Sequence, residues 1–264
     1  MDAPTLSASS GATRGAAPSR WTVASRWAAT TGLGHHGGMS LWEPPNLAGV
    51  RVSYDSGQLG EEGLARDPLT QFRGWWQDAA ASDISEPNAM VLATVDAAGR
   101  PTTRMVLLKG FDERGFVFFT NYHSRKAQQM AVNSHVSLCF PWYPLHRQVT
   151  VTGMAQRISE AESEAYFRSR PKGSQLAAWA SRQSEVIPDR AALESRYQAL
   201  AARGPAGVEP AVPDFWGGYL VVASTVEFWH GRESRLHDRL RFTANDGTAA
   251  LDRSADWRLQ RISP

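Results

Sequence analysis

The sequence is poor in the features that mark several common protein classes. Its 264 residues include one cysteine, Cys139, so no disulfide can form within the chain. We interpret this thiol, in the apolar run VSLCF, as a small buried hydrophobic group rather than a nucleophile. No apolar stretch approaches the ~20 residues that a membrane-spanning helix needs. Lysine and arginine total 28 against 26 acidic residues, which argues against a nucleic-acid-binding protein with its usual basic stripe.

Several catalytic and nucleotide-binding motifs are missing as well. There is no G-x-G-x-x-G after a strand-like segment, no P-loop and no G-x-S-x-G elbow. His35 and His36 lie in the N-terminal tail and the other five histidines are scattered without paired spacing, so we expect no metal site. Strong nucleophilic or acid–base machinery is therefore not visible in the sequence.

Residues 1–46 differ in composition from the rest of the chain. They are rich in Ala, Ser, Gly and Thr and contain no continuous hydrophobic segment, so they do not form a secretory signal. We expect a disordered tail or a start codon assigned too early, with Met39 as the true start. Their acid-poor, Arg- and Ser-containing character also faintly resembles a transit peptide. From residue 47 to 264 we expect a single domain, because 42% hydrophobic residues and ten tryptophans can build a core.

The order of the predicted elements favours an antiparallel, mainly β fold with helices packed around it (α+β). Asp67 followed by Pro68, Ser124, and the capping box Ser159–Glu162 each predict a helix start. Further helices are expected after Pro171 and over 189–202. Strands are expected over 89–96, 101–110, 116–121, 135–143, 147–158, 219–231 and 235–244. Because most strands follow one another through turns, such as the NDG turn after the last one, a small barrel is the simplest architecture.

Two clusters of basic residues lie on a predicted strand and at a predicted helix start. Arg104 and Lys109 in RMVLLK would face opposite sides of a regular strand. They could belong to two sites, or to one site if a bulge intervenes, or they could simply be charged residues at the ends of a strand. Arg125 and Lys126 follow Ser124 at a helix start, where free backbone N–H groups favour an anion. A phosphate would compensate these two cations, although a solvated helix start has the same sequence.

A third cluster lies in YFRSRPKGSQLAAWASRQS. Tyr166 and Arg170 are four residues apart and share a helix face, and Ser174 follows near a new helix start. Ordinary capping is the alternative to an anion site here. Gln183 and Ser184 come next and can donate hydrogen bonds from a loop.

The stretch EFWHGRESRLHDRL places Arg235, His237 and Arg239 on alternate positions. On a strand they would share one face, and a turn at Gly231 would bring Trp229 back beside them. A solvated edge strand and a structural histidine are the plain alternatives. Two phosphate-sized clusters without strong acid–base groups indicate an enzyme in which a cofactor supplies the chemistry.

These motifs, in this order, resemble the pyridoxine/pyridoxamine 5'-phosphate oxidase family. The matching stretches, from about Arg51 to Pro264, are DPLTQF, AMVLATVD, RMVLLK, TNYHSRKA, FPWYPLHRQV, YFRSRPKGSQLAAWASRQS, FWGGY, EFWHGRESRLHDR and RISP. The resemblance implies an FMN-binding split β-barrel, dimeric and cytoplasmic, with its two FMN sites at the subunit interface. It also implies oxidation of pyridoxine or pyridoxamine 5'-phosphate to pyridoxal 5'-phosphate, as in vitamin B6 synthesis, with hydride passing to FMN and then electrons to O2, giving H2O2. Partners of another kind, nucleic acid or membrane, are not expected.

The resemblance also implies roles for individual residues. The FMN contacts would be Arg104, Met105, Val106, Leu107, Leu108, Lys109, Phe119, Thr120, Arg125, Lys126, Gln148, Gln183, Ser184, Trp229 and Arg239. The substrate contacts would be Lys109, Tyr166, Arg170 and Ser174 at its phosphate, Arg235, Leu236 and His237 at its ring, and Arg51 and Tyr54 from an N-terminal lid. Arg235 and His237 would be the catalytic residues. The rival interpretations are another split-barrel flavin or deazaflavin oxidoreductase, a non-catalytic flavin- or haem-binding module, and a pyridoxal phosphate carrier.

Overall fold

The structure is a computed structural model that describes residues 53–54, 57–203 and 210–264. The N-terminal segment 1–46 and Arg51, both named in the sequence predictions, lie outside these residues. Chain contacts group Arg51–Pro264 as one unit, and the exact limits of the expected 47–264 domain stay a prediction.

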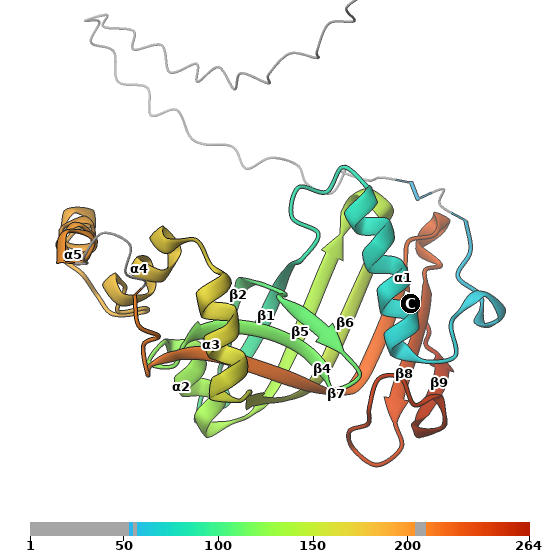
Figure 1. Cartoon of the computed structure of the whole chain (residues 1–264). Helices are drawn as coiled ribbons and strands as arrows, with labels where there is room; N and C mark the ends of the chain where they lie inside the picture. Colours follow the sequence, from blue (N-terminus) through green and yellow to red (C-terminus); the bar gives the residue numbers. More distant parts are fainter. Residues whose placement is uncertain (1–52, 55–56, 204–209) are drawn as a thin grey trace, which may run out of the picture. The chain divides into compact units, whose positions relative to one another are not determined.

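In the described part of the chain, nine antiparallel strands form one sheet (Figure 1). The main path runs β2-β1-β5-β6-β7-β4-β3, and β8 and β9 continue from β7. The strands are β1 Ala89–Val95, β2 Pro101–Leu107, β3 Gly110–Asp112, β4 Gly115–Asn121, β5 His135–Trp142, β6 Arg147–Arg157, β7 Trp216–His230, β8 Asp238–Ala244 and β9 Trp257–Arg261. Because β2 ends this path, one of its edges has no strand partner there, which matters for the site below.

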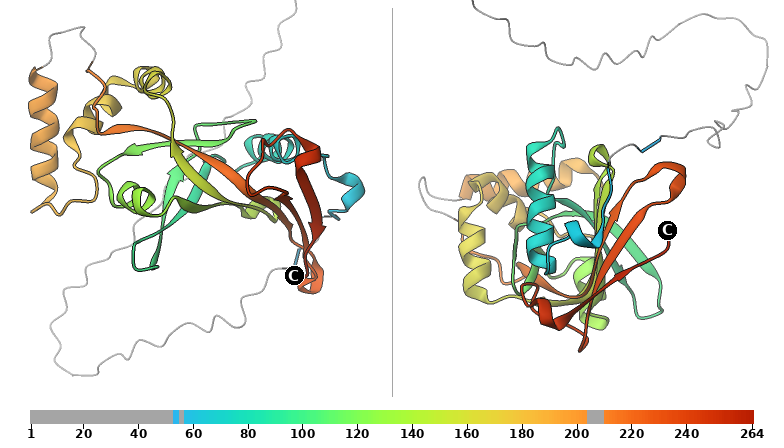
Figure 2. Two further views of the ribbon diagram at one scale, coloured as in Figure 1. Left: turned by 90° about the horizontal axis from the view of Figure 1, so that it is seen from below. Right: turned by 90° about the vertical axis from the view of Figure 1, so that its right-hand side faces the viewer.

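The helices are α1 Pro68–Ala81, α2 Arg125–Val132, α3 Glu160–Ser169, α4 Lys172–Ala180 and α5 Arg190–Arg203. The predicted caps are confirmed: the Asp67 side chain accepts the N–H of Thr70 at the start of α1, and Ser159 and Glu162 form the capping box of α3. Figures 1 and 2 show α1 beside β8 and β9 at one end of the sheet, and α3, α4 and α5 at the other. None of the described helices is long and apolar enough to cross a bilayer.

An aromatic core fixes α1 against the sheet. The Phe72 ring has no exposed surface and lies 4.9 Å from the Phe116 ring and 5.1 Å from the Phe140 ring. Trp75 meets Phe228 of β7 edge-on at 5.2 Å. Each of these rings removes a large apolar area from water and prefers such tilted contacts. The helix predicted from Asp67 and Pro68 therefore seals one face of the sheet.

The pairing of β6 with β7 is irregular at one point. The register shifts between Thr152 and Gly153, as in a β-bulge. A Cβ at Gly153 would lie 2.1 Å from the carbonyl oxygen of Val222, so the two backbones approach too closely for any side chain. Cys139, on β5, is half-buried rather than fully buried, and burial raises the pKa of its thiol.

Two predicted strands are three residues shorter in the structure than expected. The strand expected over 101–110 ends at Leu107, because the Leu108 N–H pairs with the carbonyl of Asn88 outside the ladder. The strand expected over 235–244 begins at Asp238, since residues 233–235 form a 3-10 turn in which Ser234 and Arg235 have φ of 54° and 61°. Arg235 and His237 therefore do not share a strand face with Arg239. The NDG turn opens a longer connection to β9, a strand that the sequence pattern did not predict.

Candidate functional site

A cavity of about 880 Å³ lies among β2, β4, the start of α2, α3 and the end of α4. Sites for small organic ligands commonly have a volume of roughly 300–1,000 Å³. Many of the predicted cofactor and substrate residues line it. They are Arg104, Met105, Val106, Leu107, Lys109, Phe119, Thr120, Tyr166, Arg125, Lys126, Arg170, Gln183 and Ser184.

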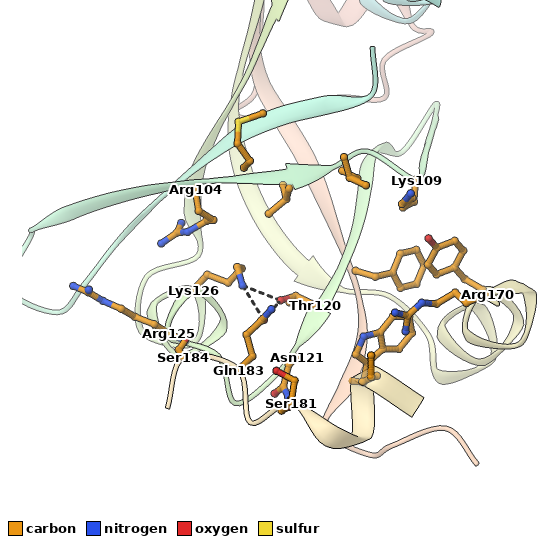
Figure 3. Close-up of a pocket in the computed structure, with 18 of the residues that line it drawn as sticks. Arg104, Lys109, Thr120, Asn121, Arg125, Lys126, Arg170, Ser181, Gln183 and Ser184 are labelled. Atoms are coloured by element: carbon orange, nitrogen blue, oxygen red, sulfur yellow. Dashed lines mark hydrogen bonds between the residues drawn. The ribbon is translucent and has the colours of Figure 1, made fainter. Parts of the chain in front are cut away.

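The cavity is lined by cations that have no acidic side chains beside them. Arg104, Lys109, Arg125, Lys126 and Arg170 all line it, and no Asp or Glu is among its described lining residues. Figure 3 shows Arg104 and Arg125 on one side, Lys109 and Arg170 on the other, and Lys126 between them. Cations that lack acidic partners in a concave site favour an anionic ligand, phosphate above all.

Lys126 is the most buried of these cations, with 9% of its surface exposed. Its Nζ donates to Gln183 Oε1 at 2.9 Å and to Thr120 Oγ1 at 3.2 Å (Figure 3). Burial lowers the pKa of Lys126 to about 8, and the nearby charge of Arg104 contributes. Neutral oxygens thus hold the ammonium group in place while leaving its charge unpaired.

Arg104 is held in the same manner. Its Nη1 donates to Thr94 Oγ1 at 2.7 Å and to the Leu92 carbonyl at 3.0 Å, and its Nη2 donates to Thr102 Oγ1 at 2.7 Å. Burial, and then repulsion from Arg125, lowers the pKa of this guanidinium.

The sequence alone left open whether Arg104 and Lys109 serve one site or two. β2 ends at Leu107, and the Lys109 N–H pairs with Val117 of β4 instead. The two cations, which a continuous strand would turn to opposite sides, consequently line one cavity.

Three nearly parallel rings form one wall. Phe119 lies 3.9 Å from Tyr166 and 5.3 Å from Trp216, and the guanidinium carbon of Arg170 lies 4.8 Å from the Trp216 ring centre. Sequence reasoning gave no role to Trp216, although it lies in the quoted FWGGY motif. Nothing in the sequence around Trp216 indicated that its ring would contact Arg170.

A second cluster brings together three other predicted site residues, Tyr54, Trp229 and His237. Trp229 lies 4.7 Å from His237, and Tyr54 lies 6.1 Å from Trp229 and 5.8 Å from His237. The prediction that the Gly231 turn brings Trp229 toward this stretch is confirmed. His146, which sequence reasoning missed, meets Tyr54 edge-on at 4.6 Å.

Backbone geometry fixes the state of His237. The Arg232 N–H donates to His237 Nδ1 at 3.0 Å, so a neutral imidazole here carries its proton on Nε2. Burial, with a contribution from Arg235, lowers the pKa of His237. The ring is therefore a neutral hydrogen-bond donor through Nε2 near pH 7.

Salt bridges tie the segment after Tyr54 to the last strands. Arg261 of β9 bridges Glu61 at 2.8 Å and Asp238 at 2.6 Å, and Asp238 also accepts the Leu59 N–H at 3.0 Å. These contacts fasten residues 59–61 to β8 and β9.

The remaining predicted residues do not line the cavity. Arg239 pairs with Glu227 at 2.8 Å, Gln148 faces Trp229 in the β6–β7 register, and Ser174 lies in the first turn of α4. Leu108 is buried in the core and Leu236 is exposed. Arg235 lies in the 3-10 turn.

β7 separates the cavity from the second cluster. Trp216 begins this 15-residue strand and Trp229 nearly ends it, and a strand of that length spans roughly 45 Å. Within one copy of the chain, none of the residues of the His237 cluster lines the cavity. In the described residues, no group of three or more His, Cys, Asp or Glu side chains could hold a metal ion.

Two family models match the chain. One, described as pyridoxamine 5'-phosphate oxidase, matches residues 77–203. The other, described as the pyridoxine 5'-phosphate oxidase C-terminal dimerisation region, matches residues 216–264. The first match includes most of the cavity, and the second includes β7, β8 and β9.

Curated relatives are similar over most of their length. The pyridoxine/pyridoxamine 5'-phosphate oxidase of Streptomyces avermitilis is 51% identical over 222 residues, which is 82% of this chain and 96% of the relative. The protein of the same name from Salinispora arenicola is 52% identical over 206 residues, or 78% and 90% of the two chains.

Solved structures confirm the predicted fold class. PhzG from Burkholderia lata 383, in complex with tetrahydrophenazine-1-carboxylic acid, superposes with a TM-score of 0.72 at 27% identity, over 81% of this chain and 100% of that one. A pyridoxamine 5'-phosphate oxidase-related, FMN binding protein from Nostoc punctiforme PCC 73102 shares the fold, with a TM-score of 0.57 at 21% identity over 73% and 97% of the chains.

Proposed function

The chain belongs to the pyridoxine/pyridoxamine 5'-phosphate oxidase family, and on that basis we propose that it oxidises pyridoxine or pyridoxamine 5'-phosphate to pyridoxal 5'-phosphate. The observation that carries this proposal is the cavity with five cations and no carboxylate among its described lining residues. Both the expected cofactor and the expected substrates are phosphomonoesters, and each needs such cations. The proposed activity places the enzyme in vitamin B6 synthesis or salvage.

The residues present fit FMN. Lys126 and Arg125 stand at the start of α2, where the Arg125 N–H donates to Ser184 Oγ at 3.1 Å. The Ser184 hydroxyl is thereby held at this corner with its own proton free, so the corner offers two positive charges and a hydroxyl donor to a phosphate. The edge of β2 that has no strand partner in the described sheet lines the same cavity and offers backbone donors and acceptors to a polar ring system. When bound, FMN supplies the acceptor for the substrate hydride and returns electrons to O2.

The substrate phosphate is assigned to the other side of the cavity. Lys109, Tyr166 and Arg170 line it there, and Nη1 of Arg170 is buried without a hydrogen-bond partner among the described residues. A buried guanidinium N–H left unpaired is costly unless a ligand accepts it. Arg also suits a phosphate because its planar fork can donate two hydrogen bonds at once.

Arg235 and His237 are proposed to hold the substrate ring. His237 Nε2–H donates a hydrogen bond to it, and Arg235 stabilises negative charge that develops on its oxygen. The main contribution of these residues is placement, because correct orientation of the reacting carbon removes much of the entropic barrier.

We also propose that the active unit is a homodimer in which each cavity receives Arg235 and His237 from the second copy. The placement of the two clusters near opposite ends of β7 supports this, because no residue of the His237 cluster lines the cavity of its own chain. The matched dimerisation region, residues 216–264, contains the loop with Arg235 and His237. The cytoplasmic location expected from the sequence stays a prediction.

Oxygen consumption by the purified protein tests the proposal. Both phosphorylated substrates are supplied, with unphosphorylated pyridoxine as the control, and the bound cofactor is extracted and identified. We expect H2O2 release with a phosphorylated substrate and recovery of FMN. A deazaflavin, or a flavin that no phosphorylated substrate reduces, would refute the proposal in favour of another split-barrel protein.

A further inference from the structure

Arg170 is held by aromatic rings rather than by acids. Its guanidinium carbon lies 4.8 Å from the Trp216 ring centre and 5.6 Å from that of Phe167. Elsewhere in the described chain, Arg239 is fixed by Glu227 at 2.8 Å, the more usual arrangement. The side chain of Arg170 therefore has a defined position while its charge stays unpaired.

Trp216 is itself fixed on two sides. Its ring stacks on Phe119 at 5.3 Å with 13° between the planes, and Phe167 meets it edge-on at 5.1 Å. Only 8% of Trp216 is exposed. It is thus a rigid surface in the cavity wall, on which the guanidinium rests.

We propose that Trp216 is a positioning residue that aims Arg170 at the phosphate of the substrate. The inference rests on the proposed function, because it takes the ligand of Arg170 to be a phosphomonoester. A carboxylate in the place of Trp216 would hold the guanidinium equally well, but it would occupy its N–H donors and repel a dianion. The face of an indole attracts the cation and leaves the N–H groups at the guanidinium edge free for phosphate.

Ligand binding to the FMN-loaded protein tests this role without turnover. The probe is 4-deoxypyridoxine 5'-phosphate, which lacks the oxidisable alcohol, and its unphosphorylated parent is the comparison. For Trp216→Leu we expect the Kd of the phosphorylated probe to rise roughly three- to thirtyfold, the value of a desolvated cation–π contact. The Kd of the parent should not change.

Two further variants make the result specific. Trp216→Phe keeps a smaller aromatic face, so we expect a smaller loss of the same phosphate-selective kind, and this variant carries the test if Trp216→Leu does not fold. Trp179→Leu is the matched control, because it removes an indole that contacts Phe215 but does not line the cavity. It should bind both probes as the wild type does.

A double-mutant cycle with Arg170→Met decides the mechanism. If Trp216 acts through Arg170, Trp216→Leu should have little further effect once Arg170 is replaced. Additive losses, equal weakening of both probes, or no loss in Trp216→Leu would overturn the proposal, as would a wild-type protein that binds no phosphorylated probe. A wild-type protein that binds the probe but oxidises neither substrate would refute the proposed function and leave this inference standing.

Discussion

Replacing Lys126 with methionine should stabilise the FMN-free protein at pH 7. Burial lowers the pKa of Lys126 from 10.5 to about 8, so keeping this residue charged in the folded chain costs roughly 3 kcal/mol. Methionine keeps the apolar stem without the charge. Loss of the Lys126 hydrogen bonds reduces this gain by roughly 1 kcal/mol. The reduction is small because Gln183 Oε1 keeps a hydrogen bond, donated by Thr120 at 3.0 Å. We therefore expect a gain of about 2 kcal/mol in the free energy of unfolding.

The gain should depend on pH in a defined direction. Between a folded pKa of about 8 and the higher value of the unfolded chain, the unfolded state binds more protons, so the stability of the wild type rises with pH. Lys126→Met lacks this rise. Its advantage should consequently shrink as the pH approaches 10, where folded Lys126 is mostly neutral.

Urea unfolding of both FMN-free proteins at pH 7 and pH 10 measures this difference. A variant less stable than the wild type at pH 7, or an advantage that does not change with pH, would refute the reasoning. FMN affinity should move the opposite way, with a loss of at least roughly tenfold at pH 7, because the ammonium faces the phosphate in the proposed complex. Unchanged FMN affinity would count against the assignment of this corner of the cavity.

Four other variants have defined outcomes. Arg235→Ala and His237→Ala should each lower kcat at least ~100-fold while the bound FMN stays at one per chain, and near wild-type kinetics in both would reject their roles. Burial lowers the pKa of His237 below 6.5, so kcat/KM should decrease with acid only at pH values below 6.5, and this decrease should be absent in His237→Gln. The same decrease in the variant would show that another group causes it. Gly153→Ala, whose Cβ would lie 2.1 Å from Val222 O, should lose roughly 3 kcal/mol of stability or more, and thermal melting within a few degrees of the wild type would contradict this.

Local signals in the sequence predicted much of the framework. Helix caps act through side chains one turn away, so Asp67, Ser124 and Ser159 mark helix starts without reference to the rest of the fold. The cations of SRKA likewise indicated an anion site, because basic residues at a helix start need a partner.

Features that depend on tertiary contacts were not visible. The end of β2 at Leu107 follows from pairing of the next residues with Asn88 and Val117, which no periodicity reveals. The strand predicted over 235–244 is confirmed from Asp238 onward, but its start was wrong, because Arg235 has a positive φ that residues other than glycine rarely adopt. The sequence motif contained Trp216, but only the folded chain shows that it supports Arg170.

The length of β7 has a genetic consequence. If every reaction centre combines the cavity of one chain with the Arg235–His237 loop of another, two different inactive alleles can rescue each other. A chain damaged only in the cavity still lends its loop, and a chain damaged only in the loop still offers its cavity. Cells that express both would assemble mixed pairs with one working centre, whereas two alleles damaged in the same half would never complement.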